Sequence, residues 1–229
     1  MFSLKIIWKS ADSFFKVAVD LKDNSNFHVG SVSKYRNIII SNHSSVIDIL
    51  ILNNLFNCSK KLKYIYKKEL RYIPIFGQIV YLVEFLKLSR NYKEDKQAIN
   101  EFIERIKLIP IYLIMFVEGT RITNENKKES TKFCISKGIT PFNNVLCPRY
   151  KGFELLTSKK VFNNVIDVTV IYDTIPSLIY FIFSPNKFNI QVFCKTYKIN
   201  QVKDSKEFLM ERFREKDELI GRILEKKYE

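Results

Sequence analysis

Residues 41–50 read SNHSSVIDIL and connect two apolar segments of the chain. The first segment, residues 37–41, has the length and composition of a buried strand, and the second continues from Val46 as an apolar helix. Between them, His43 lies in the predicted turn and Asp48 lies in the first turn of the predicted helix. A strand that turns directly into a helix is typical of α/β folds, and the rest of the chain is organised around this connection.

His43 and Asp48 form a candidate acid–base pair. The chain has only two histidines, so a side chain that exchanges a proton near pH 7 is scarce in it. Residues five apart on an unbroken helix point away from each other, but a bend between these two would bring the carboxylate to an imidazole nitrogen. A carboxylate that holds one ring nitrogen leaves the other to act as a base, as in a Ser-His-Asp triad. The other histidine, His28, has no evident partner, and we interpret it as structural.

A structural interpretation of the same stretch stays open at this point. Ser44 and Ser45 are favourable N-cap residues, and Ser45 followed by Asp48 three residues later has the form of a capping box. A single histidine in a turn is also more often structural than catalytic. Taken alone, these residues favour the structural interpretation.

Composition limits the kind of protein. A length of 229 residues suits one domain, and the apolar share of 46% is too high for a disordered chain. The net charge of +14 indicates an anionic partner, which could be nucleic acid, a phospholipid surface or a phosphorylated substrate. The four cysteines have no CxxC spacing, so neither a metal site nor a disulfide is expected, and they suit reduced thiols in a domain that faces the cytosol.

Predicted strands and helices alternate along the chain. Only six glycines and six prolines are present, which argues against the many tight turns of a β-sandwich. Residues 110–117 form an almost continuous apolar run, which predicts a strand buried on both faces in the middle of a sheet. The alternation predicts a single α/β domain with a mixed central sheet flanked by helices. Other predicted elements are strands at residues 27–32, 62–66, 85–88, 145–149, 165–172 and 188–195, and helices at residues 95–107, 127–137 and 208–228.

The N-terminal segment has a different pattern. Apolar and charged residues recur at helical spacing over residues 4–21, which predicts an amphipathic helix. With Trp8 and Phe15 beside lysines, this helix suits either a membrane interface or packing on the domain's own core. We therefore divide the chain into residues 1–22, a helix that could lie in a membrane interface, and residues 23–229, the main domain. No signal peptide and no membrane span are evident.

A second unusual stretch, residues 118–121, reads EGTR and directly follows the apolar run at residues 110–117. Open α/β sheets place their ligand sites at the C-terminal ends of such strands. Gly119 would allow a tight turn, and Arg121 could bind a phosphate with its planar guanidinium group. Taken alone, the stretch also fits a surface turn with an ordinary ion pair.

Four short blocks, in this order and at this spacing, resemble those of the PlsC-type glycerolipid acyltransferases. Asn42, His43 and Asp48 match the NHxxxxD block, and Arg90 after an apolar strand matches the block that holds the acceptor's phosphate. Residues 116–121 match the F-x-E-G-T-R block. Residues 146–153 match the proline block in its P-R-x-K-G-F form. Residues 166–172 and 213–217 resemble downstream segments of the eukaryotic branch of the family. The resemblance covers roughly residues 36–220.

This resemblance implies an acyl-CoA-dependent O-acyltransferase that acylates the free glycerol hydroxyl of a lysophospholipid. The default acceptor is 1-acyl-sn-glycerol-3-phosphate, which would give phosphatidic acid, and lysophosphatidylinositol and lysocardiolipin are alternatives. In the family pattern, His43 acts as the general base and Asp48 orients it. The residues that would contact the substrates are Arg90 and Arg121 on the acceptor's phosphate, Glu118, Gly119 and Thr120 around that pocket, and Pro148 on the acyl-CoA side.

The implied partners are a lysophospholipid, acyl-CoA and a membrane surface, with no metal, no nucleic acid and no cofactor beyond acyl-CoA as co-substrate. The resemblance also implies a membrane-associated enzyme at the endoplasmic reticulum that faces the cytosol. Two competing interpretations stay open. One is a basic nucleic-acid-binding domain, which the charge would suit although no recognition motif is visible, and the other is a family member that binds membranes but has lost activity.

Overall fold

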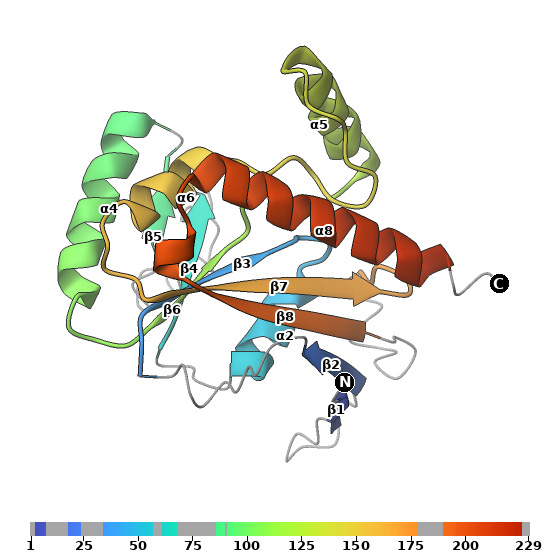
Figure 1. Cartoon of the computed structure of the whole chain (residues 1–229), viewed down its shortest axis with the longest axis horizontal. Helices are drawn as coiled ribbons and strands as arrows, with labels where there is room; N and C mark the ends of the chain where they lie inside the picture. The colour runs from blue at the N-terminus through green and yellow to red at the C-terminus, as the bar shows by residue number, and fades with distance from the viewer. Residues whose placement is uncertain are drawn as a thin grey trace.

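The computed structural model describes residues 3–7, 18–23, 34–56, 61–67, 86–89, 91–177 and 190–225. Its strands are β1 (Ser3–Ile7), β2 (Ala18–Asp23), β3 (Asn37–Ser41), β4 (Leu62–Lys67), β5 (Leu86–Leu88), β6 (Tyr112–Met115), β7 (Asn164–Tyr172) and β8 (Ile190–Lys198). They form one sheet in the order β1-β2-β8-β7-β3-β6-β4-β5 (Figure 1).

The strands from β7 to β5 in this order run parallel. β3 pairs with both β6 and β7, and β4 pairs with β6 and β5, all in the same direction. β8 is antiparallel to β7, so the predicted mixed sheet is confirmed. Because β3, β6 and β7 are parallel, their C-terminal ends reach the same edge of the sheet. The NHxxxxD stretch follows β3 and the EGTR stretch follows β6, so the topology brings the two together.

Helices cover both faces of the sheet (Figure 1). On one face lie α4 (Tyr92–Ile106), α6 (Tyr150–Thr157) and α8 (Ser205–Glu225), and on the other lies α2 (Ile47–Phe56). Successive side chains of β3 alternate between these layers, because Ile38 and Ile40 pack in the core on the first face and Ile39 packs in the core beside α2. β6 is buried along its whole length, which confirms the central strand predicted within residues 110–117.

The predicted N-terminal helix is wrong where the structure describes it. The pattern over residues 4–21 predicts a helix, but β1 and β2 lie there instead. β2 pairs in parallel with β8, and β1 pairs antiparallel with β2. This pairing gives hydrogen-bond partners to the backbone groups on the outer edge of β8. The apolar pattern of the N-terminal segment alone does not reveal that such an edge is available. Residues 8–17 lie outside the described residues, and contact of this segment with a membrane stays a prediction.

The strand predicted at residues 145–149 is also wrong, because this segment joins no strand among the described residues. The N–H of Arg149 donates to the carbonyl of Val117 at 2.7 Å instead of to a neighbouring strand. Pro148 has no N–H to give to a sheet. The segment therefore ties the EGTR loop to the start of α6 rather than extending the sheet.

The remaining helices predicted at residues 95–107, 127–137 and 208–228 correspond to α4, α5 (Asn124–Ser136) and α8. α5 projects away from the sheet, whereas α4 and α8 pack on it (Figure 1). None of the helices in the described ranges is long and apolar enough to cross a membrane. The strand predicted at residues 27–32, and His28 within it, lie outside these ranges.

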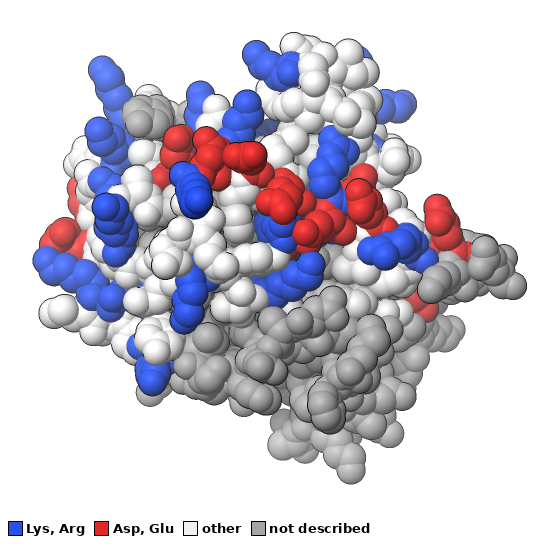
Figure 2. Space-filling view, viewed as in Figure 1, with Lys and Arg blue, Asp and Glu red and all other residues white. Residues whose placement is uncertain are grey.

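Charge is mixed on the face of the molecule that carries α4, α6 and α8. Figure 2 shows Asp and Glu side chains gathered along the line of α8, with Lys and Arg side chains around them and over α4. Binding to a nucleic-acid backbone needs a basic surface that follows the phosphates. The described part of this face offers no unbroken surface of that kind, so it does not favour the nucleic-acid interpretation.

Candidate active site

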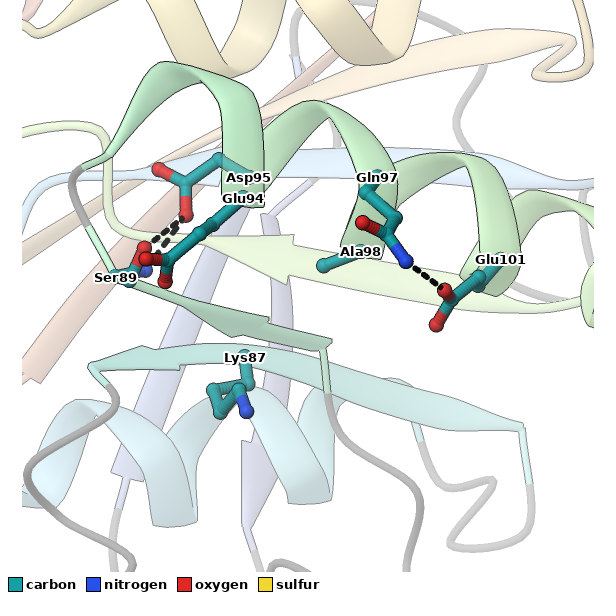
Figure 3. Close-up of a pocket in the computed structure, with 7 residues that line it drawn as sticks. All are labelled: Lys87, Ser89, Glu94, Asp95, Gln97, Ala98 and Glu101. Atoms are coloured by element: carbon teal, nitrogen blue, oxygen red, sulfur yellow. Dashed lines mark hydrogen bonds between the residues drawn. The ribbon is translucent and has the colours of Figure 1, made fainter.

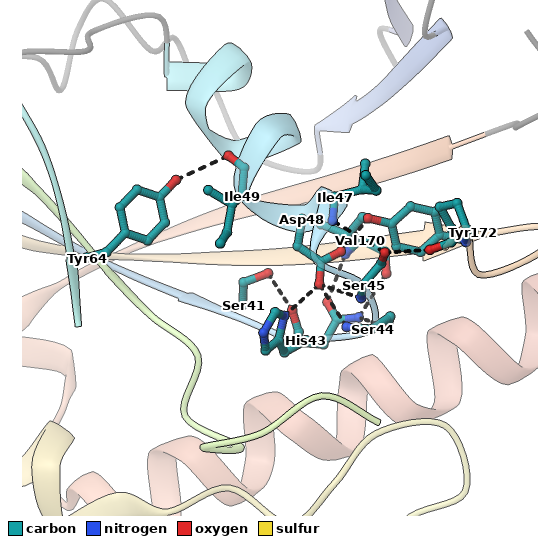
Figure 4. A network of polar contacts seen from close by, with 12 residues as sticks. Ser41, His43, Ser44, Ser45, Ile47, Asp48, Ile49, Tyr64, Val170 and Tyr172 are labelled. Atoms are coloured by element: carbon teal, nitrogen blue, oxygen red, sulfur yellow. Dashed lines mark hydrogen bonds and ion pairs between the residues drawn. The ribbon is translucent and has the colours of Figure 1, made fainter. Parts of the chain in front are cut away.

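His43 and Asp48 meet beyond the C-terminal end of β3 (Figure 4). The distance between His43 Nδ1 and Asp48 Oδ2 is 2.9 Å. Asp48 is fully buried, and the side chain of His43 is 16% exposed. α2 begins at Ile47, so a turn separates the two residues and brings the carboxylate back to the ring. The predicted contact between His43 and Asp48 is therefore confirmed.

The capping interpretation of the same stretch is correct as well. Asp48 Oδ2 accepts hydrogen bonds from the Ser44 N–H at 2.8 Å and from the Ser45 N–H at 3.0 Å. The Ser45 hydroxyl accepts from the Ile47 N–H at 3.3 Å and donates to the Pro176 carbonyl at 2.7 Å. One carboxylate thus satisfies backbone donors at the start of α2 and also holds the imidazole.

The hydrogen bonds that Asp48 accepts determine which imidazole nitrogen of His43 carries the proton. Oδ2 accepts two backbone N–H groups, so it is an acceptor toward His43 Nδ1 as well. Nδ1 then carries the ring proton, and Nε2 presents a lone pair. The ring also stacks on Phe116, with centroids 4.0 Å apart and the ring planes at 18°. The stack and the hydrogen bond together hold the imidazole in one orientation.

Asn42 anchors the turn that carries His43. Its Nδ2 donates to the Val170 carbonyl at 2.8 Å, and its Oδ1 accepts from the Val170 N–H at 2.9 Å. These bonds continue the pairing of β3 with β7 beyond the end of β3. The His43 carbonyl accepts from the Ile122 N–H at 2.9 Å, which ties the turn to the segment after EGTR. The asparagine of the NHxxxxD block is thus a structural residue that determines where His43 lies.

Glu118 lies in the protein interior near this pair. It is 3% exposed, and among the described residues neither carboxylate oxygen has a hydrogen-bond partner of good geometry. Burial, with the charge of Asp48 in addition, raises the pKa of Glu118 well above its usual value. The backbone N–H groups of His43 and Leu146 and the ammonium of Lys216 lower it, but by less. The side chain therefore favours the neutral carboxylic acid, which can donate a hydrogen bond.

Gly119 brings the EGTR loop against the proline block. Its φ of +73° lies in the left-handed region, and a Cβ at this position would come within 3.2 Å of Arg149 Cδ. Both features favour glycine here. Pro148 is buried beside this contact, at the start of α6. The structure therefore brings Pro148 next to the EGTR loop, as expected for two walls of one site.

Thr120 and Arg121 lie farther out on the loop. Asn126 of α5 ties them together, because its Nδ2 donates to Thr120 Oγ1 at 3.2 Å and to the Arg121 carbonyl at 2.8 Å. Thr123 caps α5 by accepting from the Asn126 N–H at 3.2 Å. Arg121 itself is exposed, so its guanidinium group is accessible to an anionic ligand from solvent.

Arg90 lies outside the residues that the structure describes, so its contact with the acceptor's phosphate stays a prediction. Its neighbour Ser89 is held by Asp95 of α4, which accepts from the Ser89 N–H at 2.6 Å and from the Ser89 hydroxyl at 3.0 Å (Figure 3). Three carboxylates on the wall of the pocket in Figure 3 make it unfavourable for a phosphate. The residues that line this pocket are Lys87, Ser89, Glu94, Asp95, Gln97, Ala98 and Glu101.

The sequence alone did not identify Tyr172 and Lys216. The Tyr172 hydroxyl donates to Asp48 Oδ1, and Lys216 Nζ forms an ion pair with Asp167 and donates to the Val168 carbonyl at 2.6 Å. Both residues lie in the two downstream segments, for which the family resemblance gives no roles. Tyr172 ends β7, and only the parallel pairing of β7 with β3 places it at the same edge as His43.

The burial of Glu118 predicts how stability depends on pH. Since the folded state raises the pKa of Glu118, this residue favours folding at low pH, and that contribution is lost as the pH rises toward the raised pKa. The Glu118→Gln variant keeps the shape of the side chain but removes the group that ionises. We expect equal free energies of unfolding for the variant and the wild type at about pH 4, and a gain of ~1–3 kcal/mol in the variant at about pH 8.

Urea unfolding at the two pH values measures this difference. The matched control is Glu129→Gln, which changes an exposed glutamate on α5 and should give no pH-dependent gain. A Glu118→Gln variant that is less stable than the wild type at about pH 8 would contradict a neutral Glu118.

Comparisons with known proteins identify a family for this chain. A family model described as Acyltransferase matches residues 18–172. A probable 1-acyl-sn-glycerol-3-phosphate acyltransferase 5 from Arabidopsis thaliana is 30% identical over 201 residues, which are 81% of this chain and 53% of the relative. Lysocardiolipin acyltransferase 1 from Mus musculus is 31% identical over 149 residues, 60% of this chain and 39% of the relative. The 1-acyl-sn-glycerol-3-phosphate acyltransferase gamma of Homo sapiens is 27% identical over 199 residues, 80% of this chain and 52% of the relative.

The chain thus spans about half the length of these relatives, or less. The residues matched by the family model extend from β2 to the end of β7, and they include the acid–base pair, the EGTR loop and the proline block. Since this range is more than half of the chain and contains the predicted site, the protein belongs to the acyltransferase family of PlsC-type glycerolipid enzymes.

Proposed function

We propose that this protein is an acyl-CoA-dependent O-acyltransferase that acylates the free glycerol hydroxyl of a lysophospholipid. The observation that carries the proposal is the 2.9 Å hydrogen bond between His43 Nδ1 and the buried Asp48, which leaves Nε2 of a partly exposed ring to act as a base. The names of the relatives, 1-acyl-sn-glycerol-3-phosphate and lysocardiolipin acyltransferases, support the same reaction class.

In this mechanism, His43 Nε2 takes the proton of the acceptor's hydroxyl as the hydroxyl oxygen attacks the thioester carbonyl carbon of acyl-CoA. Asp48 stabilises the imidazolium that forms, through the hydrogen bond at Nδ1. The tetrahedral intermediate then collapses, the bond between carbon and sulfur breaks, and the imidazolium proton passes to the sulfur of CoA. The products are the acylated lipid and free CoA, and His43 is returned to its neutral form.

The acceptor that we propose first is 1-acyl-sn-glycerol-3-phosphate, with phosphatidic acid as the product. The exposed Arg121 at the end of the EGTR loop supports this choice, because a guanidinium group can form two parallel hydrogen bonds with a phosphate. The proposed substrate contacts are Arg90 and Arg121 on the phosphate, Glu118, Gly119 and Thr120 around it, and Pro148 on the acyl-CoA side.

We propose further that the enzyme works at a membrane surface, on the cytosolic side of the endoplasmic reticulum, with acyl-CoA as its co-substrate and no metal or other cofactor. The net charge of +14 supports contact with anionic lipid head groups. Both substrates carry a long acyl chain, so an interface is where the enzyme would meet them.

The proposal is tested with the purified chain, radiolabelled oleoyl-CoA and mixed micelles of one lysophospholipid at a time. The acceptors compared are lysophosphatidate, lysophosphatidylinositol and monolysocardiolipin, and we expect lysophosphatidate to be acylated fastest. Arg121→Ala should raise the KM for lysophosphatidate about tenfold with little change in the KM for oleoyl-CoA. Arg105→Ala, which removes an exposed arginine of α4, is the control and should change neither constant.

If another acceptor is acylated faster, that lipid replaces lysophosphatidate as the proposed acceptor, and the proposed reaction class is unchanged. Monolysocardiolipin is the second candidate, because the mouse lysocardiolipin acyltransferase is 31% identical to this chain over the region they share. Lipid binding without acyl transfer to any acceptor would indicate a binding protein instead. Tight, salt-sensitive RNA binding without lipid binding would indicate the nucleic-acid function.

A further inference from the structure

We propose that Tyr172 is a positioning residue for the acid–base pair, whose hydroxyl holds the Asp48 carboxylate in the orientation that His43 needs. The consequence for acyl transfer rests on the proposed function, whereas the contact itself does not. Nothing in the family blocks of the sequence assigns a role to this tyrosine. Figure 4 shows its hydroxyl directed at Asp48 from the side opposite His43.

Tyr172 reaches Asp48 because of the sheet topology. It is the last residue of β7, and β7 runs parallel to β3, so its side chain arrives at the edge where the NHxxxxD turn leaves β3. Tyr172 is 5% exposed and packs in the same core as Ile47 and Ile51 of α2. A buried phenol needs a hydrogen-bond partner, and the Asp48 Oδ1 atom is the one that the structure provides.

The two oxygens of Asp48 have separate tasks. Oδ2 accepts from His43 Nδ1 and from the N–H groups of Ser44 and Ser45, while Oδ1 accepts from Tyr172. Donors on both oxygens fix the rotation of the carboxylate plane, which a contact at Oδ2 alone would leave free to turn. Burial, and then the charge of Asp48, raise the pKa of Tyr172 well above 10, so the phenol keeps its proton and acts as the donor.

The Tyr172 hydroxyl also weakens the negative potential that the Asp48 carboxylate exerts on the His43 ring. The other titratable groups that interact with Asp48 are Tyr172 from β7 and Glu118 from the loop after β6, and Lys216 from α8 interacts in turn with Glu118. Of these, Tyr172 is the one that donates a hydrogen bond to the carboxylate among the described residues. Removing this donor concentrates negative charge on Asp48 and so favours the protonated imidazole.

The experiment is an NMR titration of the His43 ring in wild type and in Tyr172→Phe, with the acyl-transfer rate measured on the same samples. The chain has only two histidines, so a His28→Gln background leaves His43 as the single imidazole signal. We expect Tyr172→Phe to move the titration midpoint to higher pH by about half a unit. We also expect kcat to fall about tenfold, with the acidic limb of its pH profile displaced in the same direction and little change in KM.

Tyr64→Phe is the matched control. Tyr64 is also a buried tyrosine, and its hydroxyl lies 2.8 Å from Asn53 Oδ1 and 3.2 Å from the Ile49 carbonyl oxygen on α2. Its single proton can be donated to either acceptor, so the loss of this hydroxyl removes a similar bond without touching Asp48. Tyr64→Phe should lower stability but leave the His43 midpoint and the shape of the pH profile as in the wild type. A Tyr172→Phe midpoint that is unchanged, or lowered, would overturn the proposal.

A second substitution keeps the test valid if Tyr172→Phe does not fold. Incorporation of 3-fluorotyrosine at position 172 keeps the shape of the residue and makes the phenol a stronger donor, so the midpoint should move to lower pH. An unchanged midpoint would count against the proposal. If the His43 titration responds as expected while no variant, including the wild type, transfers acyl groups, the positioning role stands and the proposed function fails.

Discussion

Replacement of His43 by alanine is expected to abolish measurable acyl transfer while the fold persists. General bases contribute about 10²–10⁴-fold to rate, and the part of the chain that the structure describes holds no second imidazole that could replace the lost one. The His43 ring makes one stacking contact, with Phe116, and one hydrogen bond, with Asp48, whose carboxylate keeps its other donors. The loss of stability should therefore be modest.

Transfer of labelled oleoyl groups to lysophosphatidate, together with thermal unfolding, measures both effects. His28→Ala is the matched control and should retain wild-type activity, because we interpret His28 as structural. An active and folded His43→Ala protein would exclude the proposed base. Equal losses in both histidine variants would point to a general effect on folding rather than to catalysis.

The part of the site that could be predicted is the part that is local in the sequence. His43 and Asp48 are five residues apart, and a single turn between a strand and a helix decides whether they meet. The EGTR loop is equally local, because Gly119 and its neighbours follow directly on a strand whose burial is evident from its composition. The α/β class and the mixed sheet follow from the alternation of such units.

What could not be predicted depends on pairing between distant segments. Tyr172 reaches Asp48 from 124 residues away, and only the register of β7 against β3 brings it there. The N-terminal segment could not be predicted for the same reason. Its amphipathic pattern suits a helix, but in the fold β2 pairs with the edge of β8, and the sequence of the segment does not reveal that edge. The segment at residues 145–149 has a strand-like composition, yet the N–H of Arg149 donates to the Val117 carbonyl and the N–H of Cys147 donates to Ser130 Oγ of α5.

Lys216→Met is expected to destabilise the fold by ~3–5 kcal/mol, because it leaves a buried carboxylate without its cation. The side chain of Lys216 is 1% exposed, and that of Asp167, its ion-pair partner, is 6% exposed. Lys216 Nζ also donates to the Val168 carbonyl at 2.6 Å and to Thr169 Oγ1 at 3.2 Å, so one side chain of α8 ties together three successive residues of β7. Urea unfolding at about pH 8 measures the loss.

The pH dependence of this loss of stability separates the effect of the unpaired charge from the effect of lost packing. Burial raises the pKa of Asp167 even with Lys216 beside it, so in Lys216→Met the carboxyl should take up a proton more readily still. A raised folded-state pKa favours folding at low pH, and the destabilisation should therefore shrink between about pH 8 and about pH 5. Lys107→Met is the matched control, because the pair of Lys107 with Glu104 is 51% and 68% exposed, lies away from Asp167 and should matter by less than ~1 kcal/mol.

The double variant Asp167→Asn with Lys216→Met decides what the buried pair contributes to the site. It removes both charges together, so most of the stability lost in Lys216→Met should return. β7 would then keep its place through packing and its strand pairing, and Tyr172 would still reach Asp48. If the double variant is stable but its His43 titration changes, the ion pair acts on the site through the position of β7 or through the charge near Glu118. If stability does not return, the bonds to Val168 and Thr169, rather than the ion pair, hold α8 on the sheet.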